Sequence, residues 1–227
     1  MTRPRSGALV VAIDGPSGSG KSTISRGVAT ALGLPVLDTG AMYRAVAYAV
    51  VRAGIDAHDP EAAAAVARSV VIAVDRGVTT LDGEDISTII RGPDVTALVS
   101  VVAAHPPVRA DLVRRQRAWV DQHGGGVVEG RDIGSVVFPD ARVKVFLTAS
   151  DDERARRRQR DEVAADREVS VADVQAAMAR RDAADSTRRV SPLRSADGAL
   201  HIDTTGRSPD DIVAEIVTAF AATEGAT

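Results

Sequence analysis

The stretch Ala8-Leu-Val-Val-Ala-Ile-Asp14, followed at once by Gly15-Pro-Ser-Gly-Ser-Gly-Lys-Ser-Thr23, decides the fold of this chain. An apolar run of strand length leads into a glycine-rich turn, and a helical pattern follows from Ser22 to Leu32. Glycines let the backbone bend sharply and aim its N–H groups at one anion, and the positive end of the helix faces the same anion. The spacing Gly-x-x-x-x-Gly-Lys-Ser between a strand and a helix therefore predicts a phosphate-binding loop.

Within this loop, Lys21 and Ser22 carry the chemistry. We expect the Lys21 ammonium to reach the outer phosphates of a nucleotide and the Ser22 hydroxyl to bind Mg²⁺. Lys21 and Lys144 are the only lysines among the 28 basic residues, and a compact ammonium suits a tight loop better than a planar guanidinium does. The residues predicted to bind the nucleotide are Gly15, Pro16, Ser17, Gly18, Ser19, Gly20, Lys21, Ser22 and Thr23.

The composition limits the class of protein. With 227 residues, of which 44% are hydrophobic, the chain can form one large domain or a core with insertions. No apolar run approaches the ~18 residues of a membrane span, the first strand leaves no room for a signal peptide, and there is no cysteine. A net charge of −3 and 3% aromatic residues disfavour a nucleic-acid binder. We therefore expect a cytoplasmic protein with neither a membrane nor a nucleic acid as its partner.

The rest of the chain alternates strands with helices. Further strands are predicted at 34–38, 127–132, 142–148 and 199–203, and further helices at 41–53, 61–69, 93–104, 106–122, 151–162, 170–185 and 208–223. This alternation predicts an α/β fold with a doubly wound parallel sheet, whose binding face lies at the carboxyl ends of the strands. Three short β-like runs at 70–74, 78–81 and 86–90, separated by turns, predict a small antiparallel β insert.

Two clusters of polar residues follow predicted strands, and we interpret them as a second ligand site. Thr39, Tyr43 and Arg44 follow the second strand and offer a ring for a base and a guanidinium for its phosphate. Arg131 and Asp132 stand at the carboxyl end of the strand at 127–132, where the arginine suits a phosphate and the aspartate suits a base amine. The structural alternatives are a helix cap at Thr39, a core Tyr43, a surface Arg44 and a buried Arg131–Asp132 ion pair.

Two segments nearer the carboxyl end also have a functional and a structural interpretation. Asp185 and Arg188 are three residues apart, so they form either a surface ion pair or part of the second ligand site. Arg154, Arg157 and Arg158 lie on one face of a predicted helix. That face is either solvated and paired with its own carboxylates or part of a mobile lid that neutralises charge during phosphoryl transfer. The four histidines share no spacing with carboxylates, and we expect them to be structural or exposed.

Four motifs, taken together, resemble those of the bacterial cytidylate kinase family. In chain order they are Gly15-Pro-Ser-Gly-Ser-Gly-Lys-Ser22, Asp38-Thr-Gly-Ala-Met-Tyr-Arg44, Glu129-Gly-Arg-Asp-Ile-Gly134 and Arg181-Asp-Ala-Ala-Asp185-Ser-Thr-Arg188. The resemblance covers nearly the whole chain. It implies a single P-loop kinase domain over 1–227, with a core at about 1–58 and 105–227, a monophosphate-binding region with the β insert at about 59–104, and a helical lid at about 153–168.

The resemblance further implies a monomeric enzyme that phosphorylates CMP and dCMP with ATP and Mg²⁺. Its catalytic residues would be Lys21, Arg131, Arg154, Arg157 and Arg158, and Ser22 would bind the metal. Thr39, Arg109 and Asp132 would contact the cytosine with Tyr43 nearby; Arg44, Arg131 and Arg188 would hold the acceptor phosphate; Ser100, Asp185 and Arg188 would face the sugar. The chain departs from the family pattern at Thr39, where many members have serine, and at 159–169, which lacks the expected lysine–glycine turn.

Other classes of protein share a loop of this kind. An adenylate- or shikimate-type kinase is the nearest alternative, because the loop alone does not identify the acceptor. A GTPase switch would need an Asn-Lys-x-Asp guanine reader, and this chain contains no asparagine. No histidine or Ser–His pairing suits a general base, which agrees with transfer to an acceptor phosphate that is already ionised.

Overall fold

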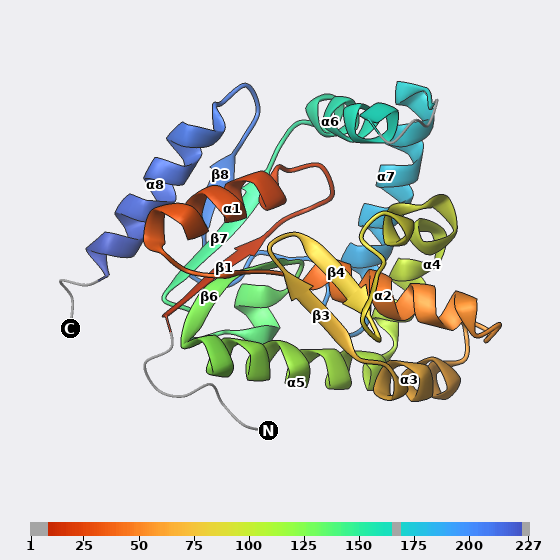
Figure 1. The fold of residues 1–227 in the computed structure, drawn as a ribbon. Helices are drawn as coiled ribbons and strands as arrows, with labels where there is room; N and C mark the ends of the chain where they lie inside the picture. Colours follow the sequence, from red (N-terminus) through yellow and green to blue (C-terminus); the bar gives the residue numbers. More distant parts are fainter. Residues whose placement is uncertain (1–8, 165–168, 224–227) are drawn as a thin grey trace.

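The computed structural model describes residues 9–164 and 169–223. Its central sheet consists of parallel strands in the order β2 (Val36–Asp38), β6 (Gly125–Gly130), β1 (Leu9–Asp14), β7 (Val143–Thr148) and β8 (Leu200–Asp203). The glycine-rich loop follows β1, the central strand, and leads into α1 (Lys21–Leu32) (Figure 1). The predicted parallel α/β sheet is therefore confirmed.

Helices cover both faces of this sheet. Side chains of a strand alternate between the two faces, and β1 carries apolar side chains on both of them. Val11 and Ile13 of β1 pack in one cluster with residues of α1 and α8 (Pro209–Ala222). Val10 and Ala12 of the same strand join the other cluster, which contains α2 (Thr39–Arg52) and α5 (Pro106–His123). Figure 1 shows α1 and α8 on one side of the sheet and α5 on the other. The fold is thus doubly wound, as predicted.

The antiparallel insert is present, but its third strand differs from the prediction. The insert consists of β3 (Ile72–Asp75), β4 (Val78–Leu81) and β5 (Glu84–Asp85), between α3 (Pro60–Ser69) and α4 (Pro93–Ala104). The strand predicted at 86–90 is wrong, because Ile89–Arg91 forms a 3₁₀ helix, η1. Ile86 and Ile90, four residues apart, are both buried, and the Ile90 N–H donates to the Ile86 carbonyl. In a strand Thr88 would share the buried face of Ile86 and Ile90, but it is exposed, and a bond from residue 90 to residue 86 belongs to a helical turn.

The strand predicted at 127–132 begins and ends two residues earlier. α5 ends at His123 and is capped by Gly124, whose φ is +72°, so Gly125 and Gly126 already belong to β6. A Cβ at Gly125 would lie 2.5 Å from the Leu9 carbonyl oxygen, which shows how closely β6 approaches β1. The strand stops at Gly130, and a short π-helical segment, η2 (Ile133–Val137), follows. Arg131 and Asp132 therefore lie in the turn at the carboxyl end of β6.

A helical hairpin lies over the carboxyl ends of the strands. It consists of α6 (Asp151–Ala164) and α7 (Val171–Thr187), which pack through Ala155, Val174 and Met178 (Figure 1). α6 covers most of the predicted lid, whereas the lid residues 165–168 lie outside the described residues. The division into core, monophosphate-binding region and lid stays a prediction. Across the described ranges, every helix is too short or too polar to cross a membrane.

Candidate active site

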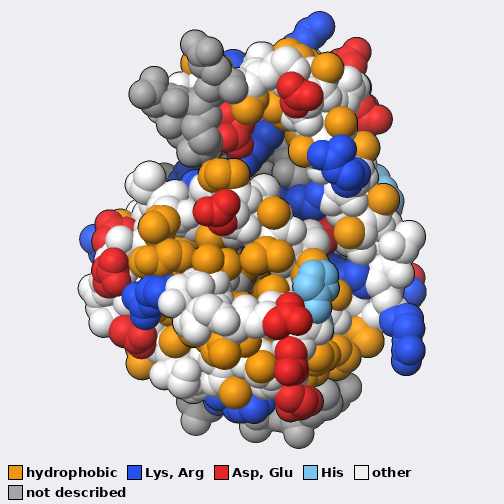
Figure 2. All heavy atoms as spheres, turned by 90° about the vertical axis from the view of Figure 1, so that its right-hand side faces the viewer, with side chains coloured by type: hydrophobic (Ala, Val, Ile, Leu, Met, Phe, Trp, Pro, Cys, Tyr) orange, Lys and Arg blue, Asp and Glu red, His pale blue; other side chains and the backbone are white. Residues whose placement is uncertain are grey.

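A cavity of about 570 Å³ lies at the carboxyl ends of the strands. Its walls come from the glycine-rich loop, α2, α4, α5, the end of β6, α6 and α7. Figure 2 shows Lys and Arg side chains gathered at the hollow below the upper part of the molecule. A cavity of this size is typical of a small-molecule site. Thus the polar clusters that the sequence separates by up to 170 residues share one space.

The glycine-rich loop has the strained backbone that its sequence predicts. Gly15 has a φ of +151°, and a Cβ there would lie 2.2 Å from the Leu147 carbonyl oxygen. The Lys21 Nζ atom donates to the Pro16 carbonyl oxygen at 2.7 Å and lies 3.5 Å from Ser19 Oγ. Burial, together with the positive charge of Arg131, lowers the pKa of Lys21 to about 7. The ammonium therefore sits inside the loop among cations, a position that an anionic ligand would stabilise.

Ser22 meets a carboxylate for which the sequence assigned no role. The Ser22 hydroxyl donates to Glu129 Oε2 at 3.1 Å, at the end of β6. Burial, followed by the Asp38 carboxylate, raises the pKa of Glu129 to about 7. Oxygen ligands of this kind suit Mg²⁺. No group of three or more His, Cys, Asp or Glu side chains in the described ranges could hold a metal ion, so phosphate and water oxygens would have to complete the coordination.

Asp132, Arg109 and Tyr43 come together as the resemblance implies. The Arg109 guanidinium forms an ion pair with the Asp132 carboxylate, and only 4% and 5% of these side chains are exposed. The guanidinium carbon of Arg109 lies 5.4 Å from the centre of the Tyr43 ring. Burial raises the pKa of Tyr43 to about 12, so its hydroxyl stays protonated. Asp132 therefore pairs with Arg109 and not, as the structural alternative had it, with Arg131.

Thr39 and Arg44 of α2 are both buried and both line the cavity. The Thr39 hydroxyl donates to the Glu129 carbonyl oxygen at 2.7 Å. The alternative of a helix cap at Thr39 is wrong, because the Asp38 side chain caps α2 by accepting from the Ala41 N–H. Arg44 donates to the carbonyl of Ile90 at 2.8 Å, and burial, followed by the charge of Arg181, lowers its pKa to about 9. The surface alternative for Arg44 is therefore also wrong.

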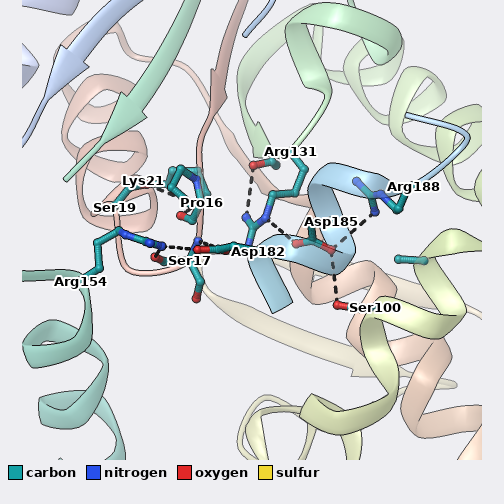
Figure 3. A network of polar contacts seen from close by, with 12 residues as sticks. Pro16, Ser17, Ser19, Lys21, Ser100, Arg131, Arg154, Asp182, Asp185 and Arg188 are labelled. Atoms are coloured by element: carbon teal, nitrogen blue, oxygen red, sulfur yellow. Dashed lines mark hydrogen bonds and ion pairs between the residues drawn. The ribbon is translucent and has the colours of Figure 1, made fainter. Parts of the chain in front are cut away.

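Asp185 is the centre of a polar network on α7 (Figure 3). Its carboxylate accepts from Arg131 Nε at 3.1 Å and from the Ser100 hydroxyl at 3.3 Å. A terminal nitrogen of Arg188, Nη1, lies 3.9 Å from its Oδ1 atom. Although burial favours the protonated acid, Arg131, Arg181 and Arg188 hold the pKa of Asp185 below its usual value. The Nε and one terminal nitrogen of Arg188 are buried without a hydrogen-bond partner among the described residues. Those donors fit an anion in the cavity.

The three arginines predicted for the lid occupy different places. Arg157 and Arg158 line the cavity, whereas Arg154 does not. Arg157 donates to Glu153 at 2.9 Å and to the Thr204 carbonyl at 3.0 Å, and Arg158 pairs with Glu162. Arg157 and Arg158 thus pair with carboxylates of their own helix, as in the structural interpretation, and both also line the cavity.

Arg181 also lines the cavity, although the sequence pattern assigned it no role. Burial, followed by the charge of Arg131, lowers its pKa to about 10. Its Nε atom has no hydrogen-bond partner in the described part of the chain. Its spacing from Asp185, four residues on one helix, could have assigned it to the same face.

The chain is similar to known proteins over almost its whole length. The family model described as cytidylate kinase matches residues 11–222. This chain belongs to the cytidylate kinase family. Over 213 residues it is 53% identical to the cytidylate kinase of Mycolicibacterium paratuberculosis, covering 90% of this chain and 92% of that protein. Over 215 residues it is 46% identical to the cytidylate kinase of Corynebacterium efficiens, covering 93% and 94%.

One solved structure supports the fold independently. An uncharacterized protein from Eubacterium ventriosum aligns with a TM-score of 0.52 at 14% identity, over 95% of this chain and 99% of that chain. At this identity the likeness concerns the fold alone. Membership of the family confirms the predicted resemblance and makes the chain a kinase with ATP as its co-substrate. The roles of individual residues stay predictions.

Proposed function

We propose that this chain transfers the γ-phosphoryl group of ATP to CMP and dCMP, giving ADP with CDP or dCDP. The observation that carries the proposal is the shared cavity. The phosphate-binding loop, Arg109, Asp132 and a group of arginines all line it, and we assign the loop to one wall and the other groups to the opposite wall. One space that receives a triphosphate on one side and a cytosine monophosphate on the other suits direct transfer between them. Membership of the cytidylate kinase family agrees with this choice of acceptor.

The loop would hold the donor. Its backbone N–H groups and Lys21 would bind the outer phosphates of ATP. The Ser22 hydroxyl, which lies 3.1 Å from a Glu129 carboxylate oxygen, would hold Mg²⁺ together with that carboxylate. The metal, when bound, neutralises charge on the β and γ phosphates. Arg157 and Arg158 at the cavity edge would add positive charge on the side of α6.

The opposite wall would hold the acceptor. Arg44, Arg131 and Arg188 would bind its phosphate. Two buried nitrogens of Arg188, which have no hydrogen-bond partner within residues 9–164 and 169–223, support this role. The Asp132 carboxylate would accept a hydrogen bond from the cytosine amine. Uracil presents a carbonyl there, and two acceptors facing each other leave a buried group unpaired. That mismatch corresponds to roughly 10- to 100-fold discrimination against UMP.

The reaction itself needs no general base. An ionised oxygen of the acceptor phosphate attacks the γ phosphorus, and the bond from that phosphorus to the β–γ bridging oxygen breaks as ADP leaves. Catalysis then consists of aligning the two nucleotides and neutralising charge on the transferred group. Lys21, Arg131 and Arg181 all lie in the cavity and carry the positive charge for this task. Because both walls come from one chain, a monomer would suffice for the reaction. We place this monomer in the cytoplasm.

An acceptor panel tests the proposal. ADP release is measured with ATP and Mg²⁺ and, in turn, CMP, dCMP, UMP, AMP, dTMP and shikimate as acceptors. We expect CMP and dCMP to give the highest kcat/KM, with UMP roughly 10- to 100-fold lower. Preference for AMP or shikimate, or equal rates for CMP and UMP, would contradict the proposed acceptor. A parallel reaction without Mg²⁺ tests the metal requirement.

A further inference from the structure

Asp182 of α7 lies beside Ser17 of the phosphate-binding loop and Arg154 of α6 (Figure 3). Its carboxylate forms an ion pair with Arg154 of α6 and accepts from the Ser17 backbone N–H at 3.5 Å. Arg154 in turn donates to the Ser17 carbonyl oxygen at 3.0 Å. Both backbone polar groups of Ser17 are thus engaged by the α6–α7 hairpin, one from each helix.

The backbone of the loop also approaches the hairpin closely. Gly18 has a φ of +76°, and a Cβ there would lie 2.8 Å from the Arg154 carbonyl oxygen and 3.0 Å from Met178 Cε. Met178 belongs to the cluster through which α6 and α7 pack together. The tip of the loop therefore rests against a surface formed jointly by both helices, with no room for a side chain between them.

The Arg154 guanidinium donates its hydrogen bonds to this contact and does not face the cavity. It bonds to Ser17, Asp182 and Asp151, only 10% of its side chain is exposed, and it does not line the cavity. Of its two carboxylate partners, Asp151 is 76% exposed and Asp182 17% exposed. A charge-assisted bond is stronger where solvent is largely excluded. Asp182 is therefore the partner that holds Arg154 against the loop.

We propose that Asp182 is a positioning residue for the donor nucleotide: through Arg154 and Ser17 it holds the phosphate-binding loop and the α6–α7 hairpin in one arrangement. The inference rests on the proposed function for the identity of the two nucleotides. Asp182 and Asp185 are three residues apart, so they lie on one face of α7. Asp182 acts on the loop side, whereas Asp185 bonds to Arg131 and Ser100 on the acceptor side. One turn of α7 thus serves both halves of the site.

The test compares three variants that each remove one carboxylate charge. Asp182→Asn should raise the KM for ATP about tenfold and leave the KM for CMP within about twofold, because the lost charged contact lies on the loop side. Asp185→Asn should instead raise the KM for CMP about tenfold and leave the KM for ATP within about twofold. Asp151→Asn removes the exposed partner of Arg154 and is the matched control, with both KM values within about twofold of wild type.

Hydrogen exchange of the protein without nucleotides supplies a readout that needs no activity. In Asp182→Asn the amides of the loop and of α6 should exchange about tenfold faster than in wild type, and in Asp151→Asn they should not. Arg154→Lys is the second variant should Asp182→Asn fail to fold, since a lysine keeps the charge but cannot bridge Ser17 and Asp182 in the same way. It should reproduce the selective effect on ATP.

Three results would overturn the inference: an unchanged ATP KM and exchange rate in Asp182→Asn, an equal rise in both KM values, or an identical phenotype in Asp151→Asn. A wild-type protein that binds ATP but does not phosphorylate CMP would contradict the proposed function alone. In that case the ATP affinity of each variant, measured by calorimetry, and the exchange rates still decide the role of Asp182.

Discussion

Arg109 and Asp132 show how single residues prepare the base half of the cavity. The Arg109 guanidinium forms an ion pair with the Asp132 carboxylate and so fixes its orientation. The Tyr43 ring packs beside the same guanidinium. The arrangement leaves Asp132 at the wall of the cavity as an oriented acceptor.

The first prediction concerns Asp132→Asn, which keeps the size of the side chain but removes its charge. We expect kcat/KM for CMP to fall roughly 10- to 100-fold more than kcat/KM for UMP, because the amide can turn its N–H₂ group toward a carbonyl. The measurement is the ratio of the two kcat/KM values. Asp111→Asn is the control, since Asp111 is also buried and paired with an arginine, Arg115, but lies away from the cavity. Equal losses for CMP and UMP would rule out base recognition by Asp132.

At the scale of elements, Asp14 connects the end of β1 to η2. Its two carboxylate oxygens accept from the N–H groups of Ile133 and Gly134, each at 2.8 Å. This connection turns the chain after β6 away from the strand direction, so that Asp132 reaches the cavity. Burial, with a smaller contribution from the Asp132 carboxylate, raises the pKa of Asp14 from 3.8 to about 6, although the two backbone hydrogen bonds and, more weakly, Lys21 oppose the shift.

The second prediction follows from this raised pKa. Between pH 3.8 and about 6 the native protein holds a proton on Asp14 that the unfolded chain releases. Its contribution to stability is therefore fully present below pH 3.8 and is lost as the pH rises through about 6. In urea unfolding, the stability of wild type relative to Asp14→Asn should fall by about 2 kcal/mol between about pH 4.5 and pH 7. A difference that stays constant across this range would contradict the raised pKa.

At the scale of the whole molecule, the cavity is a concentration of like charge. Lys21, Arg44 and Arg181 each have a lowered pKa, caused first by burial and then by neighbouring arginines. Yet the chain as a whole carries a net charge of −3. The fold thus gathers cations from α1, α2 and α7 at one edge of the sheet, where an anionic ligand relieves their repulsion.

The third prediction is that stabilisation by the acceptor depends on its phosphate. At a concentration about 100 times its Kd, CMP should raise the free energy of unfolding by about 2.7 kcal/mol. Cytidine at the same concentration should raise it far less, because it leaves Arg44, Arg131 and Arg188 without an anion. Thermal or urea unfolding with each compound provides the measurement. Equal stabilisation by cytidine and CMP would mean that these arginines do not hold the acceptor phosphate.

The elements of the fold were largely predictable, and the exceptions have physical causes. Apolar runs and caps such as Asp59, Ser170 and Ser208 are local, and the corresponding helices begin as expected. The run at 86–90 looked like a strand because its isoleucines are β-branched, but burial of Ile86 and Ile90 against the core favoured a helical turn. Similarly, Gly125 and Gly126 lie outside the strand predicted at 127–132, but their close approach to β1 makes them the start of β6.

The sequence by itself determined the phosphate-binding loop, the parallel sheet and the family, because glycine spacing and apolar periodicity act through the local backbone. Only the tertiary structure decided which charged groups meet. Ser22 bonds to Glu129 across 107 residues, and Asp182 reaches the Ser17 N–H across 165. No local pattern specifies such pairs, since the crossovers of a parallel sheet bring distant strand ends to one edge and helix packing then selects the partners. For this reason Arg154, predicted as a lid arginine, bonds to the Ser17 carbonyl oxygen and to Asp182 and does not line the cavity.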